Sequence, residues 1–249
     1  MALKPEHNTG LKSMAHEALH DLVHFDLRLF HTIPALLFKP GKVTERSLHP
    51  GQKEYVRPFA LFVFLNFLFF IVKSKGLFHY ALDSYRGYFE PLIMHKAAEL
   101  KIGQDLMAER FNIAMHFEQK EYFVIMVPLF ALVLWLLYGL RRGSFALYLV
   151  FALNYYSFLI AFLILVPWFT QLFYIIPGAG VVIESESFLI GLTYCTCWLY
   201  LVFALKRVYQ SSVLQSILRG AALSLTTLTL IVFVYRTLLF FIVLHSIAE

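Results

Sequence analysis

The sequence predicts an all-α integral membrane protein with about five transmembrane helices and an amphipathic N-terminal helix. The first observation is an uncharged stretch of 41 residues, Gly143 to Ile183, about twice the ~20 apolar residues that cross a bilayer. The second is composition: 59% of residues are hydrophobic and 15% charged, against about 45–50% and about 25% in soluble domains. The third is that the apolar runs are continuous, which favours spanning helices over a barrel of short alternating strands.

Residues 1–55 are expected to form a cytoplasmic or interfacial region. Between residues 11 and 38 apolar side chains recur every three or four positions, which predicts an amphipathic helix on the bilayer surface. Pro34 is expected to kink or break this helix, and Pro40-Gly41 to end it. The basic stretch that follows is expected to contact anionic lipid headgroups. It comprises Lys39, Lys42, Arg46, Lys53 and Arg57.

Residues 56–249 are expected to form the transmembrane helical domain. The five apolar runs that predict its spans are 56–72, 122–140, 145–166, 187–205 and 222–245. A polar loop at 73–121 separates the first two and is expected to be extracytoplasmic, with one or two amphipathic helices. Residues 167–183 fit either an extracytoplasmic turn or a shallow re-entrant piece. The sequence leaves five spans against six open.

The distribution of Lys and Arg predicts the orientation. The N-terminal region and the short loops at 141–142 and 206–219 are basic, whereas the loop at 184–186 carries only glutamates. Because basic loops stay in the cytoplasm, the N-terminus is expected inside and the C-terminus outside. The loop at 73–121 argues mildly against this, since it holds seven basic residues, although seven acidic ones balance them. The formal charge of +5 therefore indicates orientation, and no nucleic-acid partner is expected.

Three histidines form the one pattern that resembles a metal site. His16, His20 and His24 are spaced four apart and would share a helix face, with Asp26 nearby. Imidazoles at that spacing can hold a metal. The favoured interpretation is nonetheless a polar face turned toward lipid headgroups, and a pH-responsive charge is a third possibility. No cofactor is predicted, and a metal at the histidine face stays an alternative.

Three polar residues fall inside apolar runs. Asn66 and Asn154 are expected to join helices through hydrogen bonds, with a small polar pocket as the alternative. Arg236 is expected either to reach the outer headgroups or to contact an anion or a lipid headgroup. Glu184 and Glu186 are its candidate partners.

Several short motifs resemble a bacterial family of multi-pass membrane proteins of unknown function, whose members often carry an N-terminal zinc ribbon. The motifs are His24-Phe25-Asp26, Thr32, Leu36 to Val43, Gly51 to Pro58, Asn66 to Phe70, Pro128 to Ala131, Leu149 to Asn154 and Arg207 to Ser211. The chain departs from the family in having no cysteine pair near its start, in Lys53 where the family usually has Arg, and in Tyr55, which follows one residue early. The resemblance implies a bacterial inner-membrane location and brings no activity.

The sequence contains no nucleophile elbow, phosphate-binding glycine loop or paired-carboxylate site. The leading hypothesis is therefore a non-enzymatic accessory factor, assembly factor or subunit that acts by contacts within and along the bilayer. Membrane lipids, and a protein partner or a second copy, are its expected partners. The alternatives are a transporter of a small solute or lipid, and a metal-dependent membrane enzyme that uses the histidine face.

Overall fold

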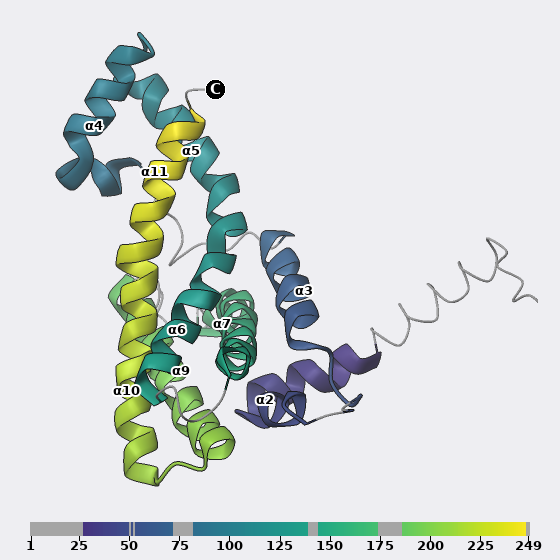
Figure 1. Ribbon diagram of the computed structural model, residues 1–249. Coiled ribbons are helices and arrows are strands. Elements are labelled where there is room, and N and C mark those ends of the chain that lie inside the picture. Colours follow the sequence, from purple (N-terminus) through teal and green to yellow (C-terminus); the bar gives the residue numbers. More distant parts are fainter. Residues whose placement is uncertain are drawn as a thin grey trace, which may run out of the picture.

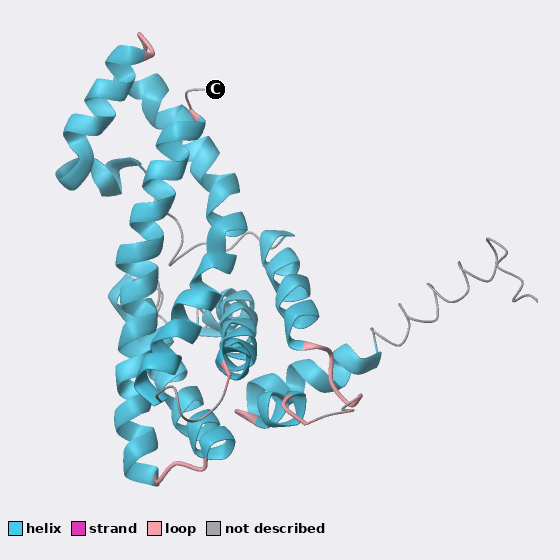
Figure 2. Ribbon diagram, in the orientation of Figure 1, coloured by secondary structure: helices cyan, strands magenta, loops and turns pink. Residues whose placement is uncertain are grey.

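The computed structural model describes residues 27–49, 51, 53–71, 82–138, 144–173 and 186–247. Every regular element in these ranges is a helix (Figure 2), which confirms the all-α prediction. Three helical segments are long and apolar enough to cross a membrane: Phe145–Phe169, Phe188–Tyr209 and Val213–Ser246. The other two expected spans appear as shorter apolar helices, Pro58–Phe69 and Tyr122–Tyr138.

Two of the helices extend beyond the ranges expected from sequence. Helix α7 (Phe145–Phe173) continues through Pro167 instead of ending near Val166. The last helix begins at Val213 instead of Ala222 and runs to Ser246 through α10 (Val213–Thr229), a π-helical stretch and α11 (Arg236–Ser246). Its start is capped by Ser212, whose hydroxyl accepts from the Gln215 amide.

Helix α7 forms the centre of the bundle. Every residue from 151 to 161 is buried, and α7 packs against α3 (Pro58–Ile71) on one side and α6 (Met126–Tyr138) on the other. Figure 1 shows α7 nearly end-on while α10 and α11 lie along the picture, so α7 crosses them steeply. Helix α9 (Glu186–Tyr209) packs along α10.

Helix α10 turns its small and polar side chains inward. Its buried residues are Ser216, Gly220, Leu223, Ser224 and Thr227. The Ser224 hydroxyl donates to the Tyr194 carbonyl of α9, and the Thr227 hydroxyl hydrogen-bonds the Tyr155 hydroxyl of α7 at 2.9 Å. A Cβ on Gly220 would lie 3.3 Å from the Val202 amide nitrogen. Close approach over small residues, together with hydrogen bonds between helices, is typical of helix packing in membranes.

The loop at 73–121 is largely helical where it is described. Helices α4 (Arg86–Glu99) and α5 (Gln104–Glu121) form the end of the molecule opposite α2 (Figure 1), and α5 continues through a 3-10 turn into α6. Aromatic residues join this end to α11, with Phe89 stacked on Phe240 at 4.3 Å between ring centroids. The aromatic cluster consists of Tyr85, Phe89, Phe111, Phe240 and Phe241.

The N-terminal segment, residues 27–57, lies across the opposite end. It contains the helix Leu27–Phe38, the turn at Pro40-Gly41 and α2 (Lys42–Ser47). The helix ends before Pro40, as expected, and it is continuous through Pro34, so the break that was one of the two alternatives at Pro34 does not occur. Pro34 lies on an exposed face of this helix, where water or headgroups can serve the carbonyl that loses its amide partner.

Candidate functional site

The turn at Pro40-Gly41 is fixed against the end of α9. Gly41 has a φ of +76°, and a Cβ there would lie 2.9 Å from the Ala204 Cα and 3.0 Å from the Ala204 carbonyl oxygen. Arg207 closes the contact, because its Nη1 donates to the carbonyls of Pro40 at 2.9 Å and Lys39 at 3.3 Å. Only glycine satisfies both the left-handed φ and the close approach, so this position sets where the segment lies.

A second contact joins the two ends of the segment. The Val56 amide donates to the Thr32 hydroxyl at 3.1 Å, and that hydroxyl donates to the Arg28 carbonyl one helical turn back. Thr32 is completely buried. The helix Leu27–Phe38 is thereby held beside residues 53–57, and the space between them becomes a fixed cleft.

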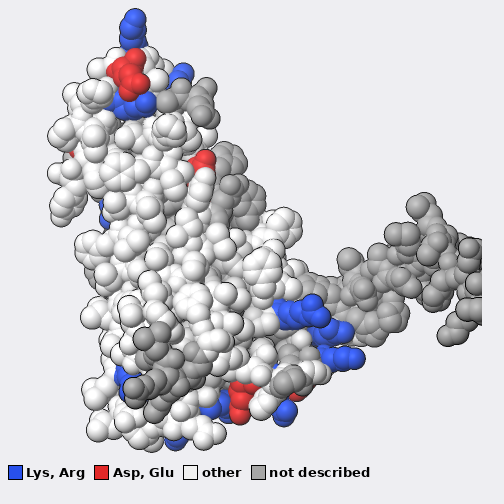
Figure 3. All heavy atoms as spheres, in the orientation of Figure 1, with Lys and Arg blue, Asp and Glu red and all other residues white. Residues whose placement is uncertain are grey.

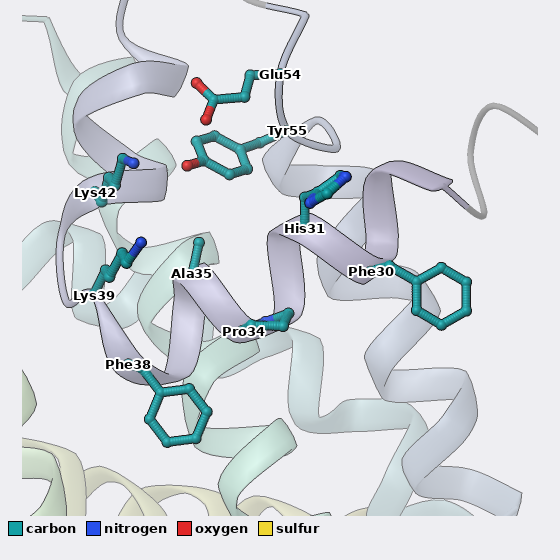
Figure 4. A pocket seen from close by; sticks show the side chains of 9 residues that line it. All are labelled: Phe30, His31, Pro34, Ala35, Phe38, Lys39, Lys42, Glu54 and Tyr55. Atoms are coloured by element: carbon teal, nitrogen blue, oxygen red, sulfur yellow. The ribbon is translucent and has the colours of Figure 1, made fainter.

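The cleft has a volume of about 500 Å³ and opens to the surface. Its lining residues are Phe30, His31, Pro34, Ala35, Phe38, Lys39, Lys42, Glu54 and Tyr55. In Figure 4 the ends of Lys39, Lys42, Glu54 and Tyr55 converge on one side, above Ala35. Phe30 and Phe38 point away from this polar side. The cleft therefore has a charged side and an apolar rim, and both suit the binding of an amphiphile.

The charge of Glu54 is engaged within the protein. Its carboxylate lies 3.9 Å from Arg46 Nε and hydrogen-bonds the Tyr55 hydroxyl. Burial, followed by that hydrogen bond and the negative charge of Glu54, raises the pKa of Tyr55 to about 12. Tyr55 therefore stays a neutral donor at physiological pH. Because Arg46 offsets the charge of Glu54, the two lysines leave this side of the cleft with a net positive charge.

The structure divides the five basic residues that were expected to contact headgroups. Lys39 and Lys42 line the cleft, whereas Arg46 pairs with Glu54 from outside it. Lys53 and Arg57 are exposed and do not line the cleft. In Figure 3 basic side chains gather at this end of the molecule, and most of the visible surface between the two ends is uncharged.

The histidine face and its carboxylate, comprising His16, His20, His24 and Asp26, lie outside the described residues. Its metal-binding and headgroup interpretations both stay predictions. Among the described residues no group of three or more His, Cys, Asp or Glu is placed to hold a metal.

Asn154 is completely buried on α7. Among the described residues, neither its side-chain oxygen nor its nitrogen has a hydrogen-bond partner, and the same holds for the buried hydroxyls of Tyr156 and Ser157. A buried polar atom without a partner costs about 1–3 kcal/mol, so this group has an unexplained energetic cost. Asn66 lies half-buried on α3, which packs against α7.

Arg236 is the first residue of α11. Its guanidinium lies over the ring of Tyr85 at 4.8 Å, and the Tyr85 hydroxyl donates to the Arg236 carbonyl at 3.3 Å. Among its candidate partners, Glu184 lies outside the described residues and Glu186 opens α9. One partner of this guanidinium is therefore an aromatic ring, which can stabilise a partly desolvated cation by ~2 kcal/mol.

Sequence reasoning assigned no binding role to Phe30, Phe38, Glu54, Tyr55 or Arg207. Tyr55 and Arg207 belong to the motifs quoted above, but sequence alone does not reveal their contacts. Arg207 hydrogen-bonds a carbonyl more than a hundred positions earlier, and Tyr55 lines the cleft together with residues of the helix Leu27–Phe38. The one local signal for the cleft was the pair of phenylalanines, Phe30 and Phe38, before the turn at Pro40-Gly41.

Residues 26–70 match the model of a protein family of unknown function, DUF3667. The matched range contains the whole helix Leu27–Phe38, α2 and nearly all of α3, so it covers the cleft. The searches of curated proteins and of solved structures returned no match.

Proposed function

We propose that this chain is a multi-pass protein of the bacterial inner membrane that acts without catalysis, as an accessory factor, assembly factor or subunit. The observation that carries the proposal is the pair of faces on α10. Its buried face holds serines and glycine, while Leu214, Leu218 and Leu225 are each at least 60% exposed. Exposed leucines over a small, polar interior suit contact with lipid or with another apolar helix, and they are unfavourable in water.

The charges at the two ends support an orientation with the N-terminus in the cytoplasm and the C-terminus outside. Residues 27–57 contain six basic and two acidic residues, whereas residues 82–121 contain five basic and seven acidic ones. Basic segments near membrane spans favour the cytoplasmic side. The N-terminal segment then lies on the cytoplasmic surface, and α4 with α5 lies outside.

The length of the last helix agrees with this placement. Its 34 residues extend ~50 Å at a rise of ~1.5 Å per residue, which exceeds the ~30 Å hydrocarbon core. Arg236 lies ~35 Å from Val213 on the same scale. With Val213 at the cytoplasmic interface, Arg236 reaches the outer headgroups and the rest of α11 extends beyond them.

Membrane insertion and orientation can be tested together. We expect the protein to stay in the membrane pellet after alkaline carbonate extraction. Alkaline phosphatase fused after Glu249 should be active and green fluorescent protein fused there should be dark, since each reports one side. A fluorescent fusion would contradict the proposed orientation, and release by carbonate would contradict insertion.

Native mass spectrometry in mild detergent, with metal analysis of the same sample, tests the non-enzymatic role. A defined multimer with bound lipid, or a stoichiometric protein partner, is the expected result. A stoichiometric metal would instead support the metal-dependent enzyme. Deletion of the gene should alter a membrane complex or an envelope property, and the absence of any change would count against the proposal.

A specific observation favours transport of a small polar solute as the second candidate. The buried groups of Asn154, Tyr156 and Ser157 lack partners among the described residues, as the wall of a polar solute site would. Asn154→Leu should then abolish solute flux in vesicles without lowering thermal stability. Higher stability with unchanged flux would assign these groups no transport role.

A further inference from the structure

We infer that the cleft formed by residues 30–42 and 54–55 binds the phosphate group of an anionic phospholipid, through Lys39 and Lys42. This inference rests on the proposed membrane location and adds the ligand class. It also narrows the expected headgroup contact from a basic stretch to one site with two cations and defined walls.

The two lysines are available to an anion. Neither ammonium makes a hydrogen bond or ion pair with any described residue, whereas the one carboxylate of the cleft, Glu54, is already engaged by Arg46 and Tyr55. Lys39 is the first residue after its helix and Lys42 opens α2, and Figure 4 shows both on the same side of the cleft. Two cations over one opening attract a phosphate more strongly than either does alone.

The position of the lysines is fixed by the backbone. They flank Gly41, which is held against Ala204, and the carbonyl of Lys39 accepts from Arg207. The opposite wall is tied by the hydrogen bond from Val56 to Thr32. A site of this kind loses little conformational freedom when it binds, which separates it from a flexible basic tail.

The apolar rim indicates a lipid rather than a free phosphate. Leu27, Phe30, Pro34 and Phe38 form an exposed stripe along one side of the helix, and Phe30 and Phe38 are 75% and 80% exposed. Nothing among the described residues covers these rings. On a helix lying in the interface, such a stripe enters the acyl boundary while the lysines stay at headgroup level.

The test uses the full-length protein in mild detergent, with binding of short-chain phosphatidylglycerol followed by native mass spectrometry. The variant Lys39→Gln/Lys42→Gln should weaken binding at least about tenfold, because it removes both charged hydrogen-bond donors for the phosphate. The matched control, Lys53→Gln/Lys206→Gln, removes the same charge from exposed residues outside the lining and should change binding less than about threefold.

Equal losses in the two double variants would overturn the inference, since general attraction to the basic end would then explain binding. Failure of the wild-type protein to bind phosphatidylglycerol, or binding of phosphatidylcholine just as tightly, would overturn it too.

A second experiment distinguishes a phospholipid from a free phosphate as the ligand. Phe30→Ser/Phe38→Ser should weaken phosphatidylglycerol binding and leave glycerol phosphate binding unchanged. If glycerol phosphate binds wild-type protein as tightly as the lipid does, the site takes a free anion and the lipid assignment fails. Carbonate extraction of every variant separates this outcome from failure of the proposed function, because a variant can stay inserted and still lose the lipid.

Discussion

The N-terminal segment and the aromatic cluster lie at opposite ends of the molecule and attach to the helices by different means. The segment is held through backbone atoms, at Gly41 against Ala204 and at the carbonyls that Arg207 contacts. The cluster is held through ring contacts around Phe240. Backbone docking fixes position and leaves side chains free for a ligand, whereas ring packing uses the side chains for stability. Binding is accordingly proposed at the first end.

The largest expected effect is at the aromatic end. Phe240 is completely buried, and Phe240→Ala should lower the free energy of unfolding by ~3–5 kcal/mol. Phe233→Ala, on the same helix but 67% exposed, is the control and should cost less than ~1 kcal/mol. Labelling of buried Cys197 by a thiol-reactive dye during heating, in a Cys195→Ser background, measures both. Equal losses would show that the cluster adds no stability.

At the docked end the sharpest change is Gly41→Ala. Gly41 and Gly51 both have a φ of +76°, so alanine at either costs ~1–2 kcal/mol of backbone strain. Only at Gly41 does the new Cβ meet the Ala204 backbone, and this should add about 2 kcal/mol and release the segment. Trypsin should then cut at Arg46 and Lys53 faster than in Gly51→Ala. Equal cleavage rates in the two variants would contradict backbone docking.

Arg207→Gln should have a smaller effect at the same end. The guanidinium donates to two backbone carbonyls and lies 4.0 Å from Glu45, but it is partly exposed, so the loss should be ~1 kcal/mol. The neighbouring Lys206→Gln removes the same charge and should be nearly silent. Thermal unfolding of the two variants side by side decides whether the hydrogen bonds of Arg207 or only its positive charge stabilises this end.

The smallest effect concerns pH. The pKa of Tyr55 is raised to about 12 in the folded protein, so ionisation favours unfolding once pH passes the ordinary value near ~10. The contribution of Tyr55 to the free energy of unfolding is fully present below pH ~10 and is lost between pH ~10 and ~12. At pH ~11 the loss is ~1 kcal/mol. Tyr55→Phe should remove this part of the pH dependence of the unfolding temperature. An unchanged profile would mean that Tyr55 ionises freely.

The helical class and the apolar helices could be read from sequence because they depend on local composition. Long uncharged runs have few alternatives to a spanning helix, and Phe145, Phe188 and Val213 open the three that are long enough. Helix ends were less accurate: α7 continues through Pro167, and the last helix starts at Val213, where the Ser212 hydroxyl caps it. The basic stretch could be predicted from its charge. Which of its five residues line the cleft could not be predicted.

The sequence by itself thus determined an all-helical protein with membrane-compatible helices, a helix that ends before Pro40 and a basic stretch after it. The tertiary structure alone decided that Lys39 and Lys42 share a cleft, that Arg46 is occupied by Glu54, and that Gly41 lies on Ala204. The physical reason is the separation along the chain over which each kind of interaction acts. Hydrophobic periodicity acts over a few residues, whereas a site forms when α9 meets a turn more than 160 positions earlier in the chain.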